Sequence, residues 1–478
     1  MRLRKMEESN RNLADQMQDM MREVKTLRAG SGSVEAKPLA GGARPSPGAS
    51  SSSGRDPAAP SYTGISGTKS AVQTPLQADF GPGFQLESDN GEYQLQIHQE
   101  TQVDYRAFNP NGEELARDGF VIPRVRLFLN GRATKSFDYM FSINRGFGAL
   151  DVLDAWVNFH PSDKFQIKVG RFMTPFNYEQ FAVQNMWLIT PERSIFTGNL
   201  GLNRQIGAMV WGQVADQRVD YAVGVFDGPR NSFEDFNNAK DVMSYLNIRP
   251  FQKNDDSILR DLNLGGSMTY GSQDNPLVPR AFRTAANASN AGTANRYAPP
   301  FLVFGDDVVE RGQRSFWSAN VAYFYKHLSV LADYNGGILR YAKNKNAPAS
   351  VDMPVSGFSV AAGYFLTGET VQRRTIVDPK RPFNLKKGAF ALGAIELAAR
   401  YSTFDIDNSV FTGKLADPSL WSNRAWATNA GVNWYLNRYV KIYLDWQHSE
   451  FGNPVLYATP GKKALTNEML WLRFQFYF

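Results

Sequence analysis

The sequence contains no cysteine and only four histidines among its 478 residues. The absence of cysteine excludes disulfides, thiolate metal sites and a lipid-modified N-terminal cysteine. The histidines are scattered along the chain and have no metal-ligand spacing; they are His98, His160, His327 and His448. Because no Ser/His/Asp-type motif accompanies them, we expect no metal, no cofactor and no catalytic centre.

The sequence also lacks a long apolar run. No segment approaches the roughly 18 apolar residues that a membrane-spanning helix requires, and the mean hydropathy is negative. A helical membrane protein is therefore excluded, whereas a membrane β-barrel is not, because its loops and half of each strand are polar. No apolar leader follows Met1, so for an exported protein we expect this to be a mature chain or an incomplete precursor.

The charge excess is small, and aromatic residues are abundant. Lys and Arg total 52 against 46 Asp and Glu, which gives a net charge of +6. This excess is compatible with anion handling but does not establish it. The 33 Phe and 20 Tyr can supply the aromatic belts found where a membrane barrel meets the lipid interface.

The last twelve residues, 467–478, read NEMLWLRFQFYF and alternate with a period of two. One face is apolar to the final residue and consists of Leu470, Leu472, Phe474, Phe476 and Phe478. The opposite face consists of Met469, Trp471, Arg473, Gln475 and Tyr477. As an edge strand of a soluble sheet this segment would promote aggregation. In a closed barrel it would pair with the first strand and face lipid on one side. The last strand of a soluble β-sandwich is the alternative.

The first 29 residues predict a coiled-coil helix. Their core positions recur at alternating spacings of three and four, which is a heptad repeat; they are Leu3, Met6, Asn10, Leu13, Met17, Met20, Val24 and Leu27. The polar Asn10 at a core position would set the register. A single amphipathic surface helix is the alternative, and the mixed core does not decide between a dimer and a trimer.

Residues 30–82 are rich in Gly, Ser, Ala and Pro and predict a flexible linker, because such a composition cannot form a core. From residue 83 to 478 the pattern is one strand after another. Period-two segments number about sixteen, an even count within the range of bacterial porins. They lie near 92–105, 121–134, 137–145, 150–160, 164–172, 204–214, 218–227, 241–250, 261–272, 314–326, 327–336, 354–366, 393–405, 425–436, 439–450 and 467–478. We therefore predict an all-β chain that forms a transmembrane antiparallel barrel.

The connections between these segments alternate in length. On one side they are short turns, at Lys135–Ser136, Pro161–Asp163, Ala215–Gln217, Lys326–His327 and Asn437–Arg438. On the other side they are mostly long, as at 106–120, 273–313 and 406–424. Short turns on one side and long loops on the other are typical of outer-membrane barrels. The longer connections near 251–260 and 367–392, on the short side, depart from this pattern.

Several motifs resemble a known family. The segments DAWVNF (Asp154–Phe159) and VGRFMTPFNYE (Val169–Glu179) are similar to the phosphate-selective porin O and P family. So are YFLTGE (Tyr364–Glu369), ELAARYS (Glu396–Ser402) and GVNWYLN (Gly431–Asn437). The resemblance covers about 120–478 and implies a homotrimeric outer-membrane porin of sixteen strands that passes anions such as phosphate.

Selectivity in such a pore comes from charges that line it. In 121–129, alternation places Val121, Val125, Leu127 and Leu129 towards lipid. The candidates for pore-lining or anion-binding positions are Arg124, Arg126, Lys164, Lys168, Arg171, Arg193, Arg204, Arg249, Arg400, Lys441 and Arg473. Arg171, Arg193 and Arg204 flank or lie within the long connection 173–203, which we expect to fold inward and narrow the channel. The alternative is that these cations pair with lumen carboxylates such as Asp220, Glu396 and Asp445.

Three functions from different classes remain open at this point. The first is a passive channel for small anions, with a non-selective general porin as its variant. The second is an envelope tether in which the barrel is an anchor in outer-membrane lipid. Its coiled coil would then reach peptidoglycan or a periplasmic partner. The third is a barrel enzyme, which the lack of a catalytic constellation disfavours; nothing indicates nucleic-acid binding.

Overall fold

The computed structural model describes residues 76–80, 83–112, 115–147, 149–285, 297–457 and 461–478. The coiled coil predicted for residues 1–29, and the predicted linker as far as residue 75, lie outside the described residues. Within the described part of the chain, no helix is long and apolar enough to cross a membrane.

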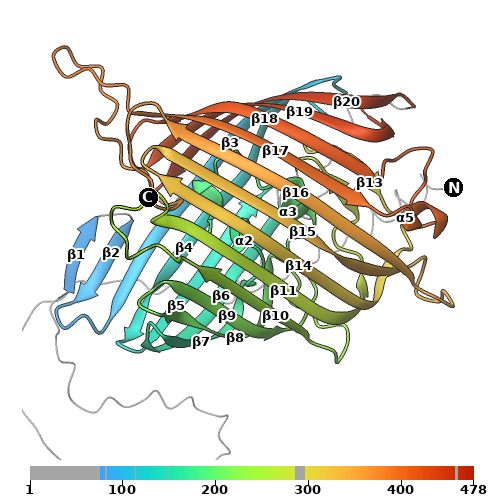
Figure 1. The fold of residues 1–478 in the computed structure, drawn as a ribbon, viewed down its shortest axis with the longest axis horizontal. Helices are drawn as coiled ribbons and strands as arrows, with labels where there is room; N and C mark the ends of the chain where they lie inside the picture. The colour runs from blue at the N-terminus through green and yellow to red at the C-terminus, as the bar shows by residue number, and fades with distance from the viewer. Residues whose placement is uncertain (1–75, 81–82, 113–114, 148, 286–296, 458–460) are drawn as a thin grey trace, which may run out of the picture. The chain divides into compact units, whose positions relative to one another are not determined.

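Sixteen antiparallel strands close into a barrel (Figure 1). In the described chain the main sheet has 18 strands. Of these, β1 and β2 form a hairpin that precedes the barrel, and the other sixteen form the barrel wall. The wall strands are β3 (Gln94–Asn109), β4 (Gly119–Thr134), β5 (Phe137–Gly146), β6 (Ala149–Ser162), β7 (Phe165–Met173), β8 (Arg204–Val214), β9 (Val219–Phe226), β10 (Asp241–Ile248), β11 (Asp261–Pro276), β14 (Val309–Tyr325), β15 (Leu328–Ala342), β16 (Val351–Phe365), β17 (Ala394–Ile406), β18 (Arg424–Tyr435), β19 (Val440–Leu456) and β20 (Lys463–Tyr477). Each of the sixteen predicted segments corresponds to one of these strands, so the predicted barrel is confirmed.

The last strand closes the barrel by pairing with the first wall strand. In the register of β20 and β3, Tyr477 lies opposite Glu100 and Glu468 lies opposite Asn109. Phe478 and Gln99 then exchange two backbone hydrogen bonds of 3.1 Å. Closure satisfies the backbone groups that an open edge would expose.

A short hairpin precedes the barrel. β1 (Leu76–Phe80) pairs with β2 (Phe84–Ser88), and β2 pairs with the start of β3, where Phe84 lies opposite Ile97. The hairpin thus pairs with β3 beyond the end of β20 (Figure 1). This hairpin was not predicted: residues 76–80 fall in the predicted linker, and the first predicted strand begins only near residue 92. Its segments are only five residues each, too short for a clear period.

The two faces of the wall differ as the alternation predicts. In β20, Leu470, Leu472 and Phe474 are 43–49% exposed on the outward face, whereas Trp471 and Arg473 are buried inward. In β4, Val125 and Leu127 are likewise exposed and Arg124 and Arg126 are buried. The apolar face therefore points outward, as a barrel in lipid requires.

One facing prediction is wrong. Val121 was expected to face lipid, but it lies opposite Asp104, a buried residue of the inward face. The register shifts between Gln102 and Asp104, which leaves Ile122 and Pro123 together opposite a single residue. Such a bulge reverses the alternation beyond it, and a proline that cannot donate to the ladder favours it.

The two ends of the barrel are unequal. One end of the barrel, here called the turn end, carries the C-terminus and the five short turns, all at the predicted places. At Lys326–His327 the turn has only two residues, and Lys326 adopts a positive φ of 51°. The turn end also carries two longer connections, 249–260 and 366–393. The opposite end, here called the loop end, carries the longer connections, except that β5 ends at Gly146 and β6 already begins at Ala149.

An apolar core lies inside the wall towards the loop end. The connection 277–308 contributes β12 (Ala281–Arg283) and β13 (Pro300–Val303), and 407–423 contributes α5 (Ser409–Thr412). Phe282 lies 5.1 Å from Phe404, between ring centroids. The interior is therefore packed at this end by loop side chains.

Candidate functional site: a cationic pocket beside the inward loop

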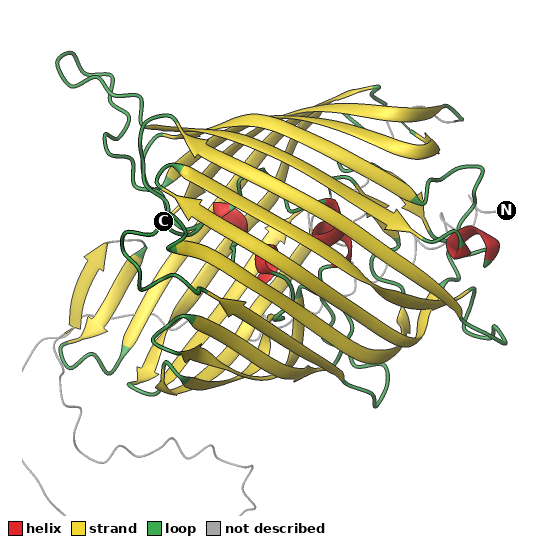
Figure 2. Cartoon of the chain, viewed as in Figure 1, coloured by secondary structure: helices red, strands yellow, loops and turns green. Residues whose placement is uncertain are grey.

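The connection 174–203, here called the inward loop, folds into the barrel (Figure 2). It contains three short helices, which are α2 (Tyr178–Phe181), η1 (Asn185–Trp187) and α3 (Ile195–Leu200). Its ends meet where the Thr174 amide and hydroxyl both donate to the Asn203 carbonyl, at 2.8 and 2.9 Å. In α3, Phe196 packs on Phe404 of the loop-end core.

Four predicted lumen cations hold the tip of this loop; they are Arg124, Arg400, Lys441 and Arg473, here called the anchor cations. Arg124 donates to both carboxylate oxygens of Glu192, at 2.6 and 2.5 Å. Arg473 donates to the same carboxylate at 2.9 Å. Arg400 donates to the Glu192 backbone carbonyl at 2.5 Å, and Lys441 to the Leu188 carbonyl at 3.1 Å.

The anchor cations are no longer accessible to a solute. Arg473 is fully buried, and Arg124, Arg400 and Lys441 are 3–4% exposed. Arg473 also donates to Asp104 at 2.6 and 2.8 Å, so two carboxylates share its charge. These cations therefore bind groups of the protein itself: Arg124 and Arg473 bind the Glu192 carboxylate, and Arg400 and Lys441 bind backbone carbonyls.

Glu192 is the anionic centre of this arrangement. Burial alone would raise its pKa, but Arg124 and Arg473 hold the pKa of the Glu192 carboxyl well below its usual range. The carboxylate is therefore charged at neutral pH and keeps both ion pairs. This partner was not among the residues predicted from the sequence, because a glutamate inside a connection has no alternation that would reveal its direction.

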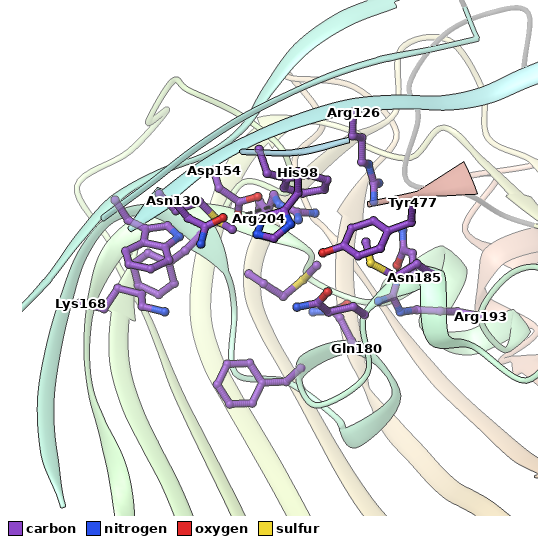
Figure 3. A pocket seen from close by; sticks show the side chains of 18 residues that line it. His98, Arg126, Asn130, Asp154, Lys168, Gln180, Asn185, Arg193, Arg204 and Tyr477 are labelled. Carbon is purple, nitrogen blue, oxygen red and sulfur yellow. Dashed lines mark hydrogen bonds and ion pairs between the residues drawn. The ribbon is translucent and has the colours of Figure 1, made fainter. Parts of the chain in front are cut away.

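A pocket of about 360 Å³ lies beside the inward loop, against the wall strands β3 to β8 and the end of β20 (Figure 3). Four predicted cations line it and are here called the pocket cations; they are Arg126, Lys168, Arg193 and Arg204. Asp154 is the single carboxylate residue of the lining. Figure 3 shows Lys168 and Arg193 on opposite sides of the pocket.

Two pocket cations have carboxylate partners. Arg204 lies 3.0 Å from Asp154, and Arg126 lies 3.2 Å from Glu100. The other two have neutral partners among the described residues. Arg193 donates to the Glu179 and Val183 carbonyls at 3.2 and 3.0 Å and to the Asn185 side chain. Burial lowers the pKa of Arg193 to about 10, so its charge remains at neutral pH.

Lys168 is held by aromatic rings. Its ammonium lies 4.0 Å from the Trp156 ring centroid and 4.9 Å from that of Trp211. Within the described part of the chain, no carboxylate lies within 4.0 Å of this ammonium. Cation–π contacts hold a cation without neutralising it, so Lys168 keeps a charge that an anion can use.

The remaining candidates lie away from this pocket. Lys164 is exposed in the turn between β6 and β7, because the strand begins only at Phe165. Arg171 turns to the connection 227–240, where it donates to the Ser232 carbonyl at 2.7 Å and stacks on Phe233. Arg249 lies just beyond β10 and pairs with Asp220 at 2.6 Å, one of the carboxylates named from the sequence.

A second inward segment enters from the turn end. In the connection 366–393, here called the strap, Arg374 pairs with Glu396 at 2.5 Å, and both side chains are buried. Arg374 also donates to the Trp187 carbonyl of the inward loop at 2.9 Å. Strap residues line a cavity of about 910 Å³ together with Arg249. The only signal for the strap in the sequence was its unusual length.

An antiparallel sixteen-stranded barrel with an apolar outer face and an inward loop beside charged wall residues defines a porin, a channel of the bacterial outer membrane rather than an enzyme. The model of the family "Phosphate-selective porin O and P" matches residues 95–478. The chain belongs to this family, as the motifs predicted.

The chain is also similar to a curated protein and to solved structures. The chain is 25% identical to Porin O of Pseudomonas aeruginosa over 395 residues, which cover 75% of this chain and 84% of that protein. The OmpT outer membrane protein of Vibrio cholerae, solved in trimer form, has a TM-score of 0.46 at 10% identity and covers 81% of this chain and 100% of its own. An anion-selective porin from Comamonas acidovorans has a TM-score of 0.47 at 10% identity, with coverage of 81% and 100%.

Proposed function

We propose that this porin is a passive diffusion channel for small anions, phosphate among them. The observation that carries the proposal is Lys168, a lumen cation with aromatic neighbours and no nearby carboxylate among the described residues. Arg126, Arg193 and Arg204 add three cations to the same pocket, and Asp154 is its one carboxylate residue. A site with such an excess raises the local concentration of anions and lowers that of cations.

The protein's family also supports a preference for anions. The family whose model matches residues 95–478 is described as phosphate-selective porin O and P. A non-selective general porin is the alternative to this proposal, and it would be favoured if the pocket cations were covered as the anchor cations are.

The test is the reversal potential of the purified full chain in a planar bilayer under a KCl gradient. We expect a potential of the sign that chloride permeation produces, and Lys168→Glu should move it towards the potassium value. Lys164→Glu, in the exposed turn, is the matched control and should change it little. A wild-type channel that prefers potassium would overturn the proposal.

We also propose that the channel is a homotrimer and that its N-terminal segment is periplasmic. With an even number of strands both chain ends belong on the turn side, and the C-terminus there is periplasmic in this class of barrel. A trimer would bring three predicted coiled-coil segments together and favour their association. Chemical crosslinking of the full chain tests the trimer, with monomers and dimers alone as the contrary result.

The envelope tether remains a second role for the same segment, supported by the heptad spacing of residues 3–27. Its partner would be peptidoglycan or a periplasmic protein. Deletion of residues 1–71 should then leave conductance and trimers intact and reduce retention by isolated peptidoglycan sacculi. Equal retention of the full and shortened chains would contradict the tether.

A further inference from the structure

The cationic pocket has an apolar half that an inorganic anion does not require. Besides its four cations it is lined by aromatic and methionine side chains, which include Phe128, Met140, Trp156, Phe172, Phe181 and Met186. Orthophosphate carries oxygens on every side, and each needs a donor or water. Phosphate oxygens that faced the apolar surface would lose their hydrogen bonds to water, and this loss costs free energy.

The aromatic surface adjoins the Lys168 ammonium. Trp211 Nε1 donates to Asn158 Oδ1 at 2.9 Å, and Trp156 lies under the Lys168 ammonium. The charge and the flat apolar surface are therefore adjacent. The same Lys168, Trp156 and Met140 also line a neighbouring cavity of about 480 Å³ at the turn end, so they stand where two cavities share a wall.

We propose that this pocket selects organic anions with a flat apolar body, that is, aromatic carboxylates. The carboxylate takes the Lys168 ammonium, and the ring lies on the Trp156 and methionine side of the pocket. A volume of about 360 Å³ is within the usual range for small-molecule sites, ~300–1,000 Å³. This inference rests on the proposed anion channel and specifies its substrate class.

The test measures block of chloride current through the full-length channel in a planar bilayer. Benzoate, acetate and orthophosphate are titrated separately at constant ionic strength, and the half-blocking concentration of each is determined. Benzoate should block at the lowest concentration. Acetate, which has the carboxylate without the ring, should be weaker by roughly three- to tenfold, the value of one aromatic contact.

Two variants separate the ring contact from the charge. Trp156→Leu removes the aromatic face and keeps an apolar side chain. Because Trp156 also contacts Lys168, orthophosphate is the reference for any change at the cation, and benzoate should weaken by a similar factor beyond the change for orthophosphate. Lys168→Gln should weaken all three anions. Met140→Gln places a polar group in the same lining and serves as the second test of the apolar surface if Trp156→Leu does not assemble. Lys164→Gln is the control for loss of a lysine nearby.

The outcomes distinguish this inference from the function on which it rests. If the channel is anion-selective but orthophosphate blocks at the lowest concentration, or if benzoate is insensitive to both Trp156→Leu and Met140→Gln, the organic-anion assignment is overturned while the anion channel stands. If the wild-type channel prefers potassium, the proposed function itself fails. Benzoate block that is strongest in the wild type and selectively lost in the Trp156 or Met140 variant supports the assignment.

Discussion

The lumen contains two groups of cations that look alike in the sequence and differ in the structure. The anchor cations Arg124, Arg400, Lys441 and Arg473 are buried and donate to the inward loop, mainly to Glu192 and to backbone carbonyls. The pocket cations line a cavity, and two of them, Lys168 and Arg193, have neutral partners among the described residues. The anchor cations thus contact the inward loop, whereas the pocket cations line a cavity that a solute could enter.

The largest expected effect is the loss of an anchor cation. Arg473→Leu would leave Asp104 and Glu192 buried with one fewer counter-charge, since both now pair with Arg473. Breaking a buried ion pair costs about 3–5 kcal/mol. We expect a lower unfolding temperature, measured by heat-modifiable gel migration, and noisier single-channel current as the inward loop moves.

Arg424→Gln is the matched control for Arg473→Leu. Arg424 pairs with Asp405 at the surface, where it is 62% exposed, and such pairs contribute at most about 1 kcal/mol. An equal loss of thermal stability in the two variants would show that burial does not distinguish them.

Loss of the strap contact should have the next largest effect. Arg374→Gln removes the partner of Glu396, which keeps hydrogen bonds from Asn433 and Tyr435 at 2.9 and 2.7 Å. We therefore expect a smaller cost than for Arg473, roughly 2–3 kcal/mol. If the strap leaves the lumen, single-channel conductance should rise. Unchanged conductance and stability would mean that the strap is held by its other contacts.

Removal of a pocket cation should change selectivity without changing stability. Lys168→Gln deletes a charge with no carboxylate partner in the described part of the chain, so no buried counter-charge is left behind. In water, a unit positive charge about 4 Å from an anion stabilises it by about 1 kcal/mol, which corresponds to roughly fivefold in anion occupancy. The chloride-to-potassium permeability ratio should fall by up to this factor. A large shift in unfolding temperature would instead assign Lys168 to the anchor group.

Mild acid should have the smallest effect on the anchor. The folded-state pKa of Glu192 lies below its ordinary value of 4.5. The stability from its ion pairs is therefore present above pH 4.5 and is lost only as the pH falls through the lower folded value. Open-channel noise should be the same at pH 7 and pH 5, and Glu192→Gln should show the noise of a released loop at both. Acid-induced noise in the wild type that Glu192→Gln lacks would contradict this assignment.

The strands and their faces could be read from the chain because both depend on local pattern. Alternation in 467–478 predicted the exposed Leu470 and Leu472 and the buried Arg473. It misplaced Val121, because a bulge at Ile122 and Pro123 shifts the register. It also missed β1 and β2, whose segments are too short to show a period.

All eight anchor and pocket cations were candidates from the sequence, since strand parity or proximity to the long connection identified them. The alternation of side chains along a strand predicts only that a given side chain points inward. Whether it is then covered depends on where the inward loop docks, and that docking joins residues far apart in the chain. Glu192 and Arg473 are separated by 281 positions, and Trp187 and Arg374 by 187.

A period of two and the turn lengths, which are local properties of the chain, were enough to predict a barrel of about sixteen strands, its lipid and lumen faces and a set of inward cations, and the sequence motifs predicted the family. Which of these cations are covered by the protein and which line a cavity could be seen only in the folded chain. The reason is physical: a charge is neutralised by whatever lies within a few ångströms, and inside a closed barrel those neighbours come from connections whose path no local pattern records.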